Sequence, residues 1–316
     1  MCSGRLPITN MNTILSEYLS QIELCEPQQF KNIVVVPIFI GTNDTSNYLT
    51  LTEALQQQLA TITEVSAAGQ VPNVKINNGS ELCLLLVDGE ELIGAKQNRT
   101  LNASILLAGK SETIVPVSCT EAGRWSYKTA AFADAGYVSP HNLRKAKSSS
   151  VAASLKAAMG HKSDQHAVWG EVAQYCLASN VQSPTSAMHD TLAARVKELE
   201  EYLQNLKPLP NQKGLVVLVN GQVLGADVVS SARAYQVLHA KFVTSYALEA
   251  LLERKPVVTE NAREKVAAFF ERAKGSAERV HRVVGCGEDH RFEGQNVAGA
   301  ALVADGNVVH LNLYRN

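Results

Sequence analysis

Three Asp-Gly or Asn-Gly dipeptides, each lying between runs of apolar residues, constrain the fold of this chain more than any other feature of its sequence. They are Asp88-Gly89, Asn220-Gly221 and Asp305-Gly306. A two-residue hairpin turn needs positive φ angles, which Gly, Asn and Asp adopt at the lowest cost. The sequence therefore predicts three antiparallel hairpins, in which the paired strands are 82–87 with 90–95, 215–219 with 222–224, and 298–303 with 308–313.

Other strand-like segments accompany these hairpins near both ends of the chain, whereas helical periodicity dominates the middle. Runs of apolar and β-branched residues predict further strands at 33–40, 101–107, 113–119 and 279–284. Apolar spacings of three and four residues predict helices at 12–24, 52–59, 142–158, 164–178, 186–206, 231–254 and 260–274. Hairpins outnumber strand–helix–strand units. The predicted fold class is therefore α+β, with a largely antiparallel sheet or sheets built from the N- and C-terminal hairpins and a helical middle section.

Two of these segments carry local features with structural consequences. Pro37 lies inside the strand 33–40 and, because proline has no backbone N–H, it favours an edge strand or a bulge. In the helix 186–206, apolar residues recur at heptad-like spacing, namely Leu192, Val196, Leu199, Leu203 and Leu206. A helix packed on the core explains this pattern. A coiled-coil partner surface is the alternative, although three turns are few for one.

The division into domains follows from a polar start and one proline-containing break. The polar residues 1–11 are predicted to form a flexible leader. The segment 207–213, which contains Pro208 and Pro210, ends a helix and allows a weak subdivision of the chain. Because strands on either side of this segment could pair in one sheet, we interpret 12–316 as a single domain.

Composition excludes several classes of function. Of the 316 residues, 46% are hydrophobic and 19% are charged, as in an ordinary globular protein, and the formal net charge is -1. No global field would gather nucleic acid or an anionic membrane. We see neither a signal-peptide pattern nor a membrane-spanning apolar run, so we expect a cytoplasmic protein. The six cysteines are scattered and no zinc motif occurs, so no metal site is predicted, and the cofactor and oligomeric state stay unknown.

The segment 88–99 is dense with side chains that can act on a ligand. Glu90 and Glu91 would face opposite sides of a strand and would not share one site, but Glu90 is a candidate acid or base. A candidate patch for an anionic or hydrogen-bonding ligand follows, made of Lys96, Gln97, Asn98 and Arg99. The alternative is the charged rim of a hairpin.

The segment 121–127 places one of only two tryptophans directly after a predicted strand. Trp125 could stack on a base or a nicotinamide-like ring, and Arg124 could bind a phosphate. Glu121 is a candidate acid or base. On the alternative interpretation Trp125 anchors a turn over the core, while Arg124 and Glu121 pair with each other.

Acidic, basic and cationic side chains also gather after the glycine-rich segment 285–287. This Gly-x-Gly segment could present backbone N–H groups to an anion. Asp289, His290, Arg291 and Glu293 follow within five residues. Asp289 is a candidate acid or base, and Arg291 is a candidate ligand-binding cation. Alternation along a strand would keep the four from sharing one site. The alternative is a polar surface loop.

The same segments carry a resemblance to a known family. Its most specific parts are 87–99 with Leu101-Asn102, and 116–119 with Glu121 and 123–127; later parts are 168–169, 225–227, 245–247, 285–291 and 309–311. Over roughly residues 12–315 the chain resembles the ADP-ribosylglycohydrolase (ARG) and rhodanese-phosphatase-superfamily-associated protein family. The resemblance implies a prokaryotic cytoplasmic protein that works near ADP-ribose or NAD metabolism. It implies no established catalytic residues.

From the residues and this resemblance together we predict a protein that binds or processes ADP-ribose, NAD or a related nucleotide. Arg124 and the segment 96–99 would meet phosphates, and Trp125 would stack on a ring. The candidate acids, bases and proton partner are Glu121, Asp289, Glu90 and His310. One alternative is a non-catalytic interaction or scaffold module, in which these residues hold turns and salt bridges. Another is a hydrolase of a different phosphorylated metabolite.

Overall fold

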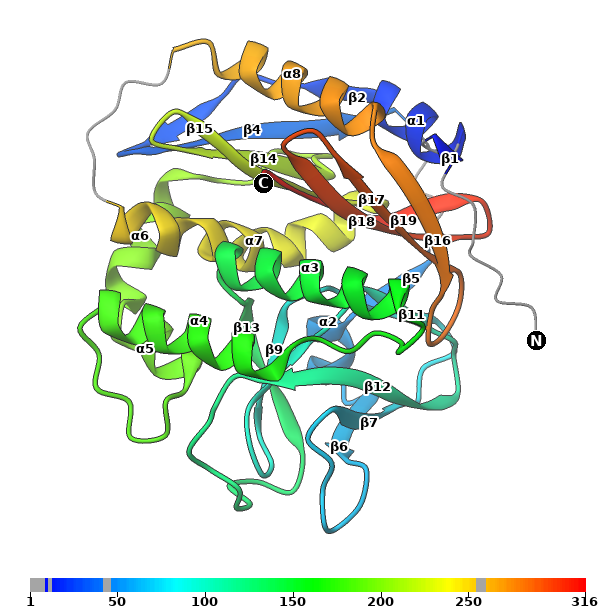
Figure 1. The fold of residues 1–316 in the computed structure, drawn as a ribbon, viewed down its shortest axis with the longest axis vertical. Helices are drawn as coiled ribbons and strands as arrows, with labels where there is room; N and C mark the ends of the chain where they lie inside the picture. The colour runs from blue at the N-terminus through cyan, green and yellow to red at the C-terminus, as the bar shows by residue number, and fades with distance from the viewer. Residues whose placement is uncertain (1–8, 11–12, 42–46, 254–259) are drawn as a thin grey trace.

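The computed structural model describes residues 9–10, 13–41, 47–253 and 260–316. It confirms the α+β class, since helices and mostly antiparallel sheets occur together (Figure 1). Apart from Thr9 and Asn10, the predicted leader lies outside the described residues. In the described parts of the chain, no helix is long and apolar enough to cross a membrane.

A ten-stranded sheet joins the two ends of the chain. Its order is β1 (Thr9–Asn10), β16 (Ala277–Arg282), β17 (Glu288–Gly294), β18 (Val297–Ala304), β19 (Asn307–Tyr314), β15 (Gln222–Val229), β14 (Gly214–Val219), β4 (Ile33–Ile40) and β2 (Ile22–Leu24), and β3 (Gln28–Phe30) also pairs with β4. All of these pairings are antiparallel. Because β4 pairs with β14, segments before and after 207–213 share this sheet.

Two smaller sheets form the other end of the molecule. One has the order β13 (Phe132–Val138), β9 (Glu90–Gly94), β10 (Arg99–Leu101), β12 (Ser111–Cys119), β7 (Asn73–Asn78) and β6 (Ala60–Glu64). The other has the order β11 (Ile105–Leu107), β8 (Cys83–Leu86) and β5 (Tyr48–Thr50), and its β5–β8 pair is parallel. The short helix α2 (Leu51–Gln56) follows β5 and begins with a capping box between Thr50 and Glu53.

Helices cover both faces of the large sheet. Helices α1 (Thr13–Ser20) and α8 (Ala262–Lys274) lie on one face, while α7 (Ala232–Leu252) and α3 (His141–Lys156) lie between the other face and the smaller sheets (Figure 1). The remaining helices are α4 (Gln165–Ala178), α5 (Met188–Ala194) and α6 (Val196–Asn205). In β4, Val34 packs in the core with α8, whereas Val35 packs in the core with α7. A strand buried on both faces needs a continuous apolar run, and residues 33–40 have one.

Two of the three predicted hairpins are present. The β14–β15 hairpin turns at Asn220 (φ 49°) and Gly221 (φ 74°), and the β18–β19 hairpin turns at Asp305 (φ 49°) and Gly306 (φ 73°). Both central residues of each turn therefore have the positive φ that the sequence argument required.

The hairpin predicted at Asp88-Gly89 is wrong. Strand β8 pairs with β5 and β11, whereas β9 pairs with β10 and β13 in a different sheet. Of the two turn residues only Gly89 has a positive φ, at 88°. The carboxylate of Asp88 instead accepts hydrogen bonds from Lys147 and Tyr314, two residues far along the chain. These long-range contacts direct the chain from one sheet to the other.

Two helices are shorter than their sequence patterns predicted. Helix α1 ends at Ser20, and residues 22–24 form β2 beside β4. The helix predicted at 186–206 is divided at Arg195 (φ -111°, ψ 11°) into α5 and α6. Leu192 and Leu199 are buried, but Val196 is 49% exposed. The heptad-like stripe is therefore not continuous, and its buried members pack on the core.

Two strand predictions also need correction. The strand predicted at 101–107 is divided after Leu101, because Asn102 turns its amide group to Ser118 and to the His161 carbonyl. Pro37 lies in an interior strand, not at an edge. Its carbonyl accepts from the Cys25 N–H in the gap between β2 and β3, where the missing N–H of Pro37 breaks no strand pairing.

Candidate functional site

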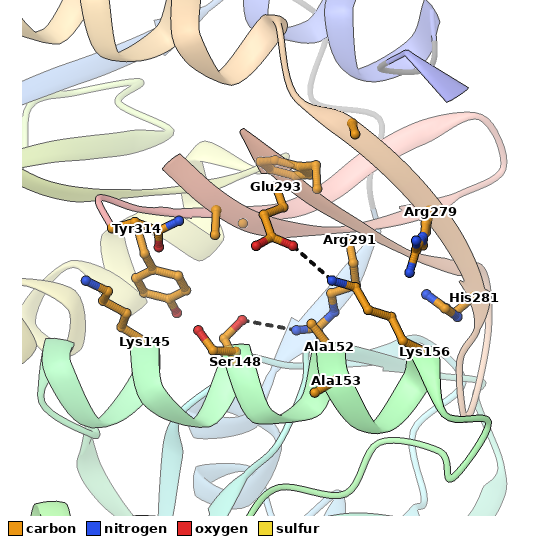
Figure 2. A pocket seen from close by; sticks show the side chains of 16 residues that line it. Lys145, Ser148, Ala152, Ala153, Lys156, Arg279, His281, Arg291, Glu293 and Tyr314 are labelled. Atoms are coloured by element: carbon orange, nitrogen blue, oxygen red, sulfur yellow. Dashed lines mark hydrogen bonds and ion pairs between the residues drawn. The ribbon is translucent and has the colours of Figure 1, made fainter. Parts of the chain in front are cut away.

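A cavity of about 520 Å³ lies between helix α3 and strands β16 to β18 (Figure 2). Helix α3 faces it with residues that recur at helical spacing, namely Lys145, Ser148, Ser149, Ala152, Ala153 and Lys156. The opposite wall contributes Ala277, Ala298 and Gly299. Because small side chains face one another across the gap, helix and sheet do not fill the space between them.

The cavity wall is strongly cationic. Its charged and aromatic side chains are Lys145, Lys156, Arg279, His281, Arg291, Phe292, Glu293 and Tyr314. Glu293 is the single carboxylate side chain among them, and it pairs with Lys156 at 2.9 Å. Both members of that pair are largely exposed, so water screens it and Lys156 can exchange partners at little cost. Within the described residues, Lys145 and Arg279 form no salt bridge at all.

Arg291 is held in a fixed orientation at the floor of the cavity. Its Nε donates to both carboxylate oxygens of Asp289 at 2.9 Å, and its Nη1 donates to Ser148 Oγ at 3.1 Å. Asp289 also contacts His161 Nε2 at 2.8 Å. Burial alone would raise the pKa of Asp289, but Arg291 and His161 hold it below its ordinary value. A guanidinium fixed in this way has one nitrogen, Nη2, left for a ligand, and it loses little entropy on binding one.

Strand β17 places these groups, although its charged sequence does not resemble a strand. It forms because β16 and β18 pair with it on both sides. The alternation that we expected is present. Asp289 and Arg291 point toward α3, whereas His290 points to the other face and bonds to Glu278. The interpretation of 289–293 as a surface loop is therefore wrong.

The pKa values of two further side chains that line the cavity lie below their ordinary values. Burial lowers the pKa of His281, Asp289 opposes this shift, and Arg291, His161 and Arg279 add to it. Burial and the neighbouring Arg315 lower the pKa of Lys145. Burial is the largest cause of both shifts, and nearby positive charge adds to each. In the described residues, no three His, Cys, Asp or Glu side chains gather as a metal site would need.

Arg124 lies elsewhere, in a cluster that holds the loop after β9. Its guanidinium donates to Glu121 at 2.9 and 2.6 Å, to Asn98 Oδ1 at 3.1 Å, and to the carbonyls of Gly94 and Ala95. Burial would raise the pKa of Glu121, but its hydrogen bonds from Arg124 and others keep that pKa below the ordinary value. The pairing of Arg124 with Glu121 is the structural alternative that the sequence allowed.

The neighbouring predicted ligand residues are also engaged within the protein. Arg99 is fully buried and donates to the backbone and side-chain oxygens of Gln97. The Trp125 ring lies 5.5 Å from the Arg99 guanidinium and 5.5 Å from Lys96 Nζ. Trp125 is 45% exposed, so it covers the protein's own cations and does not anchor a turn over an apolar core.

Glu90 is fully buried. Its carboxylate contacts Lys241 Nζ at 2.6 Å, and Lys241 also contacts Asp134 at 2.8 Å. Burial raises the pKa of Glu90 in spite of Lys241. Glu91 points the other way and accepts from Thr120 at 2.7 Å, as the alternation argument predicted. Burial raises the pKa of Glu91 to about 8.

His310 belongs to another buried cluster. Its Nδ1 lies 2.7 Å from Ser104 Oγ, and its Nε2 lies 3.6 Å from a carboxylate oxygen of Asp227. Asp227 forms a fully buried salt bridge with Arg144, with an N–O distance of 2.6 Å. Since His310 is only 1% exposed, a ligand would have to displace packed residues to reach it.

The structure thus separates the predicted site residues into several places. Segment 96–99 meets 121–125, Arg291 lines the cavity with Asp289 behind it, and Glu90 and His310 lie in buried clusters. Sequence reasoning missed the other polar lining residues, which are Lys145, Ser148, Ser149, Lys156, Arg279, His281, Tyr314 and Asn316. The available signal was in the segment 145–156, where lysine, serine and alanine recur at helical spacing along the face that lines the cavity.

Comparison with known proteins gives one match. A family model described as the ARG and Rhodanese-Phosphatase-superfamily-associated Protein domain matches residues 21–314, which confirms the resemblance seen in the sequence. No curated protein and no solved structure matches the chain. The family description records an association and no reaction.

Proposed function

The chain belongs to the family of ARG and Rhodanese-Phosphatase-superfamily-associated Proteins, and we propose that the cavity beside α3 binds a phosphate-bearing ligand such as ADP-ribose, NAD or a related nucleotide. One observation carries this proposal. Four cationic side chains and one carboxylate side chain line a cavity of about 520 Å³. Such an excess of positive charge in a concave, partly desolvated space favours an anion.

The size and arrangement of the cavity support a small molecule. Its volume falls within the roughly 300–1,000 Å³ that is usual for ligand pockets. Lysines line the α3 wall and arginines line the strand wall (Figure 2). A ligand with two phosphates could therefore meet cations on both sides. Arg291, already fixed by Asp289 and Ser148, offers the planar N–H geometry that suits phosphate oxygens.

ADP-ribose is the first ligand to test, because the family resemblance implies a role near ADP-ribose metabolism. The proposal moves the phosphate contacts away from Arg124 and the segment 96–99. The donors of those side chains already form hydrogen bonds within the protein. Arg291 is the predicted ligand residue that the proposal keeps.

Isothermal titration calorimetry with ADP-ribose, NAD and AMP tests the proposal, with Arg279→Gln as the decisive variant. Arg279 lines the cavity and forms no salt bridge with any residue that the structure describes, so its loss should weaken binding and leave the fold intact. One charge-assisted hydrogen bond contributes roughly 1.5–3 kcal/mol, so we expect about ten- to hundredfold weaker binding.

The matched control is Arg263→Gln. Arg263 is an exposed arginine on α8, and it pairs with the exposed Glu26. We expect this variant to bind like the wild type. If none of the three nucleotides binds, or if Arg279→Gln binds them as tightly as the control does, the proposal is wrong.

A further inference from the structure

We propose that His281 is a nucleophile, which accepts a phosphoryl group from an acyl phosphate or phosphate ester bound in the cavity and then passes it to water. This inference rests on the proposed function, because the cavity must first take a phosphate group. It adds a reaction to what is otherwise a binding site.

The position of His281 supports this role. It lies two residues from Arg279 on β16, so both side chains point to the same face of the sheet. In the register of β16 and β17, His281 pairs with Asp289 and Arg279 pairs with Arg291. His281 therefore has one arginine on its own strand and another diagonally across. Figure 2 shows His281 beside Arg279 at one end of the cavity, near Lys156.

The imidazole of His281 is free to react. In the described part of the chain neither of its ring nitrogens has a hydrogen-bond partner, and neither is one of the fully buried polar atoms that lack one. Burial lowers its pKa, Asp289 opposes that shift, and Arg291 and Arg279 add to it, so the net shift favours the neutral, nucleophilic form of the ring. The cations that lower this pKa also face the charge of a bound phosphate.

The other histidines do not combine these properties. His141, His290 and His310 are buried at 2%, 0% and 1% exposure. Three others bond to protein groups: His161 to Asp289, His189 to Tyr137, and His239 to Tyr235. His166 is exposed at the start of α4 and does not line the cavity.

The proposed reaction has two balanced steps. First, an unprotonated ring nitrogen of His281 attacks phosphorus, the phosphorus–oxygen bond to the leaving group breaks, and that oxygen departs with the electron pair. A carboxylate leaving group needs no proton, whereas an alkoxide takes one from water. In the second step water attacks the phosphohistidine, the phosphorus–nitrogen bond breaks with its electron pair returning to the ring, and the proton lost by water goes to solvent. Arg279, Arg291 and Lys156 would stabilise the charge on the equatorial oxygens.

The test uses acetyl phosphate as the phosphoryl donor and the full chain as the enzyme. The measurements are intact-protein mass, ³¹P NMR of the acid-labile phosphate, and the release of inorganic phosphate. We expect wild-type protein to carry one acid-labile phosphate and His281→Asn to carry none. Arg279→Gln should form it on the order of a hundred- to a thousandfold more slowly, as when one transition-state donor is removed. His166→Asn is the matched control and should behave as wild type.

Binding of inorganic phosphate, measured by calorimetry on the same variants, separates the two proposals. Phosphate binding without phosphohistidine in the wild type would overturn the role of His281 and leave the binding site standing. If the wild-type protein neither binds phosphate nor forms phosphohistidine, both proposals are overturned. A phosphohistidine that persists in His281→Asn would place the nucleophile elsewhere and also refute the inference.

Discussion

Replacing Arg124 with alanine decides between the two roles that the sequence allowed for this residue. In the structure its side chain is 13% exposed and its guanidinium bonds to Glu121, to Asn98 and to backbone carbonyls. Removing one partner of a buried ion pair costs about 3–5 kcal/mol. Glu121 keeps its bonds from Thr185 and the Asn98 N–H. We therefore expect Arg124→Ala to lower the free energy of unfolding by about 3 kcal/mol, near the lower end of that range.

This cost can be converted into a melting temperature. An unfolding entropy of about 2.1 cal/mol/K per residue gives roughly 0.7 kcal/mol/K for a chain of 316 residues. A loss of about 3 kcal/mol then lowers Tm by about 4–5 °C. Differential scanning calorimetry measures the change. Arg263→Ala serves as the control, because its exposed pair with Glu26 is worth at most about 1 kcal/mol.

The difference between wild type and Arg124→Ala should also depend on pH. The pKa of Glu121 lies below its ordinary value, so the stabilisation from this pair is present above the ordinary pKa and is lost as pH falls through the folded-state pKa. A Tm within 1 °C of wild type, with nucleotide binding lost, would refute the structural role and return Arg124 to the ligand site.

Two further predictions concern the strand β9. Burial raises the pKa of Glu91 to about 8, so wild-type stability should fall as pH rises from the ordinary carboxyl pKa through 8. Glu91→Gln cannot ionise, and urea denaturation should show a smaller loss between pH 5 and 9; parallel pH profiles would contradict the assignment. Gly94 has a φ of 112°, and an added Cβ would lie 2.3 Å from Thr129 Oγ1. Gly94→Ala should therefore lower the free energy of unfolding by roughly 1–3 kcal/mol, and an unchanged urea midpoint would show that the loop relaxes freely.

The sequence predicted correctly those turns whose conformation depends mainly on the residues within the turn. Asn220-Gly221 formed its hairpin because both residues adopt the positive φ that the turn needs. Asp88-Gly89 did not, because Asp88 is committed to Lys147 and Tyr314. Strand β17 was not predicted because its sequence is rich in charged residues. It forms a strand because β16 pairs with its backbone and Ser148 on α3 accepts a hydrogen bond from Arg291.

The same limit applies to the candidate site. Arg291 and Asp289 could be named from the sequence because acid and cation types recur there. The cavity itself could not be predicted from the sequence, because it forms only where α3 packs beside β17. The hydrogen bond between Ser148 and Arg291 there joins residues that are 143 positions apart. Side-chain types suggested binding chemistry for Arg124 as well, but its geometry shows that its donors are already used.

The position of β4 in the large sheet has a consequence for synthesis on the ribosome. This apolar strand pairs with β14, so the nascent chain must grow from Ile40 to beyond Val219 before that partner exists. At about 5–20 residues per second, the wait is on the order of ten seconds or more. Through that time β4 has only β2 and β3 to cover its backbone. Until β14 has been synthesised, the unpaired edge of β4 is therefore exposed to pairing with strands of other chains, which would lead to aggregation.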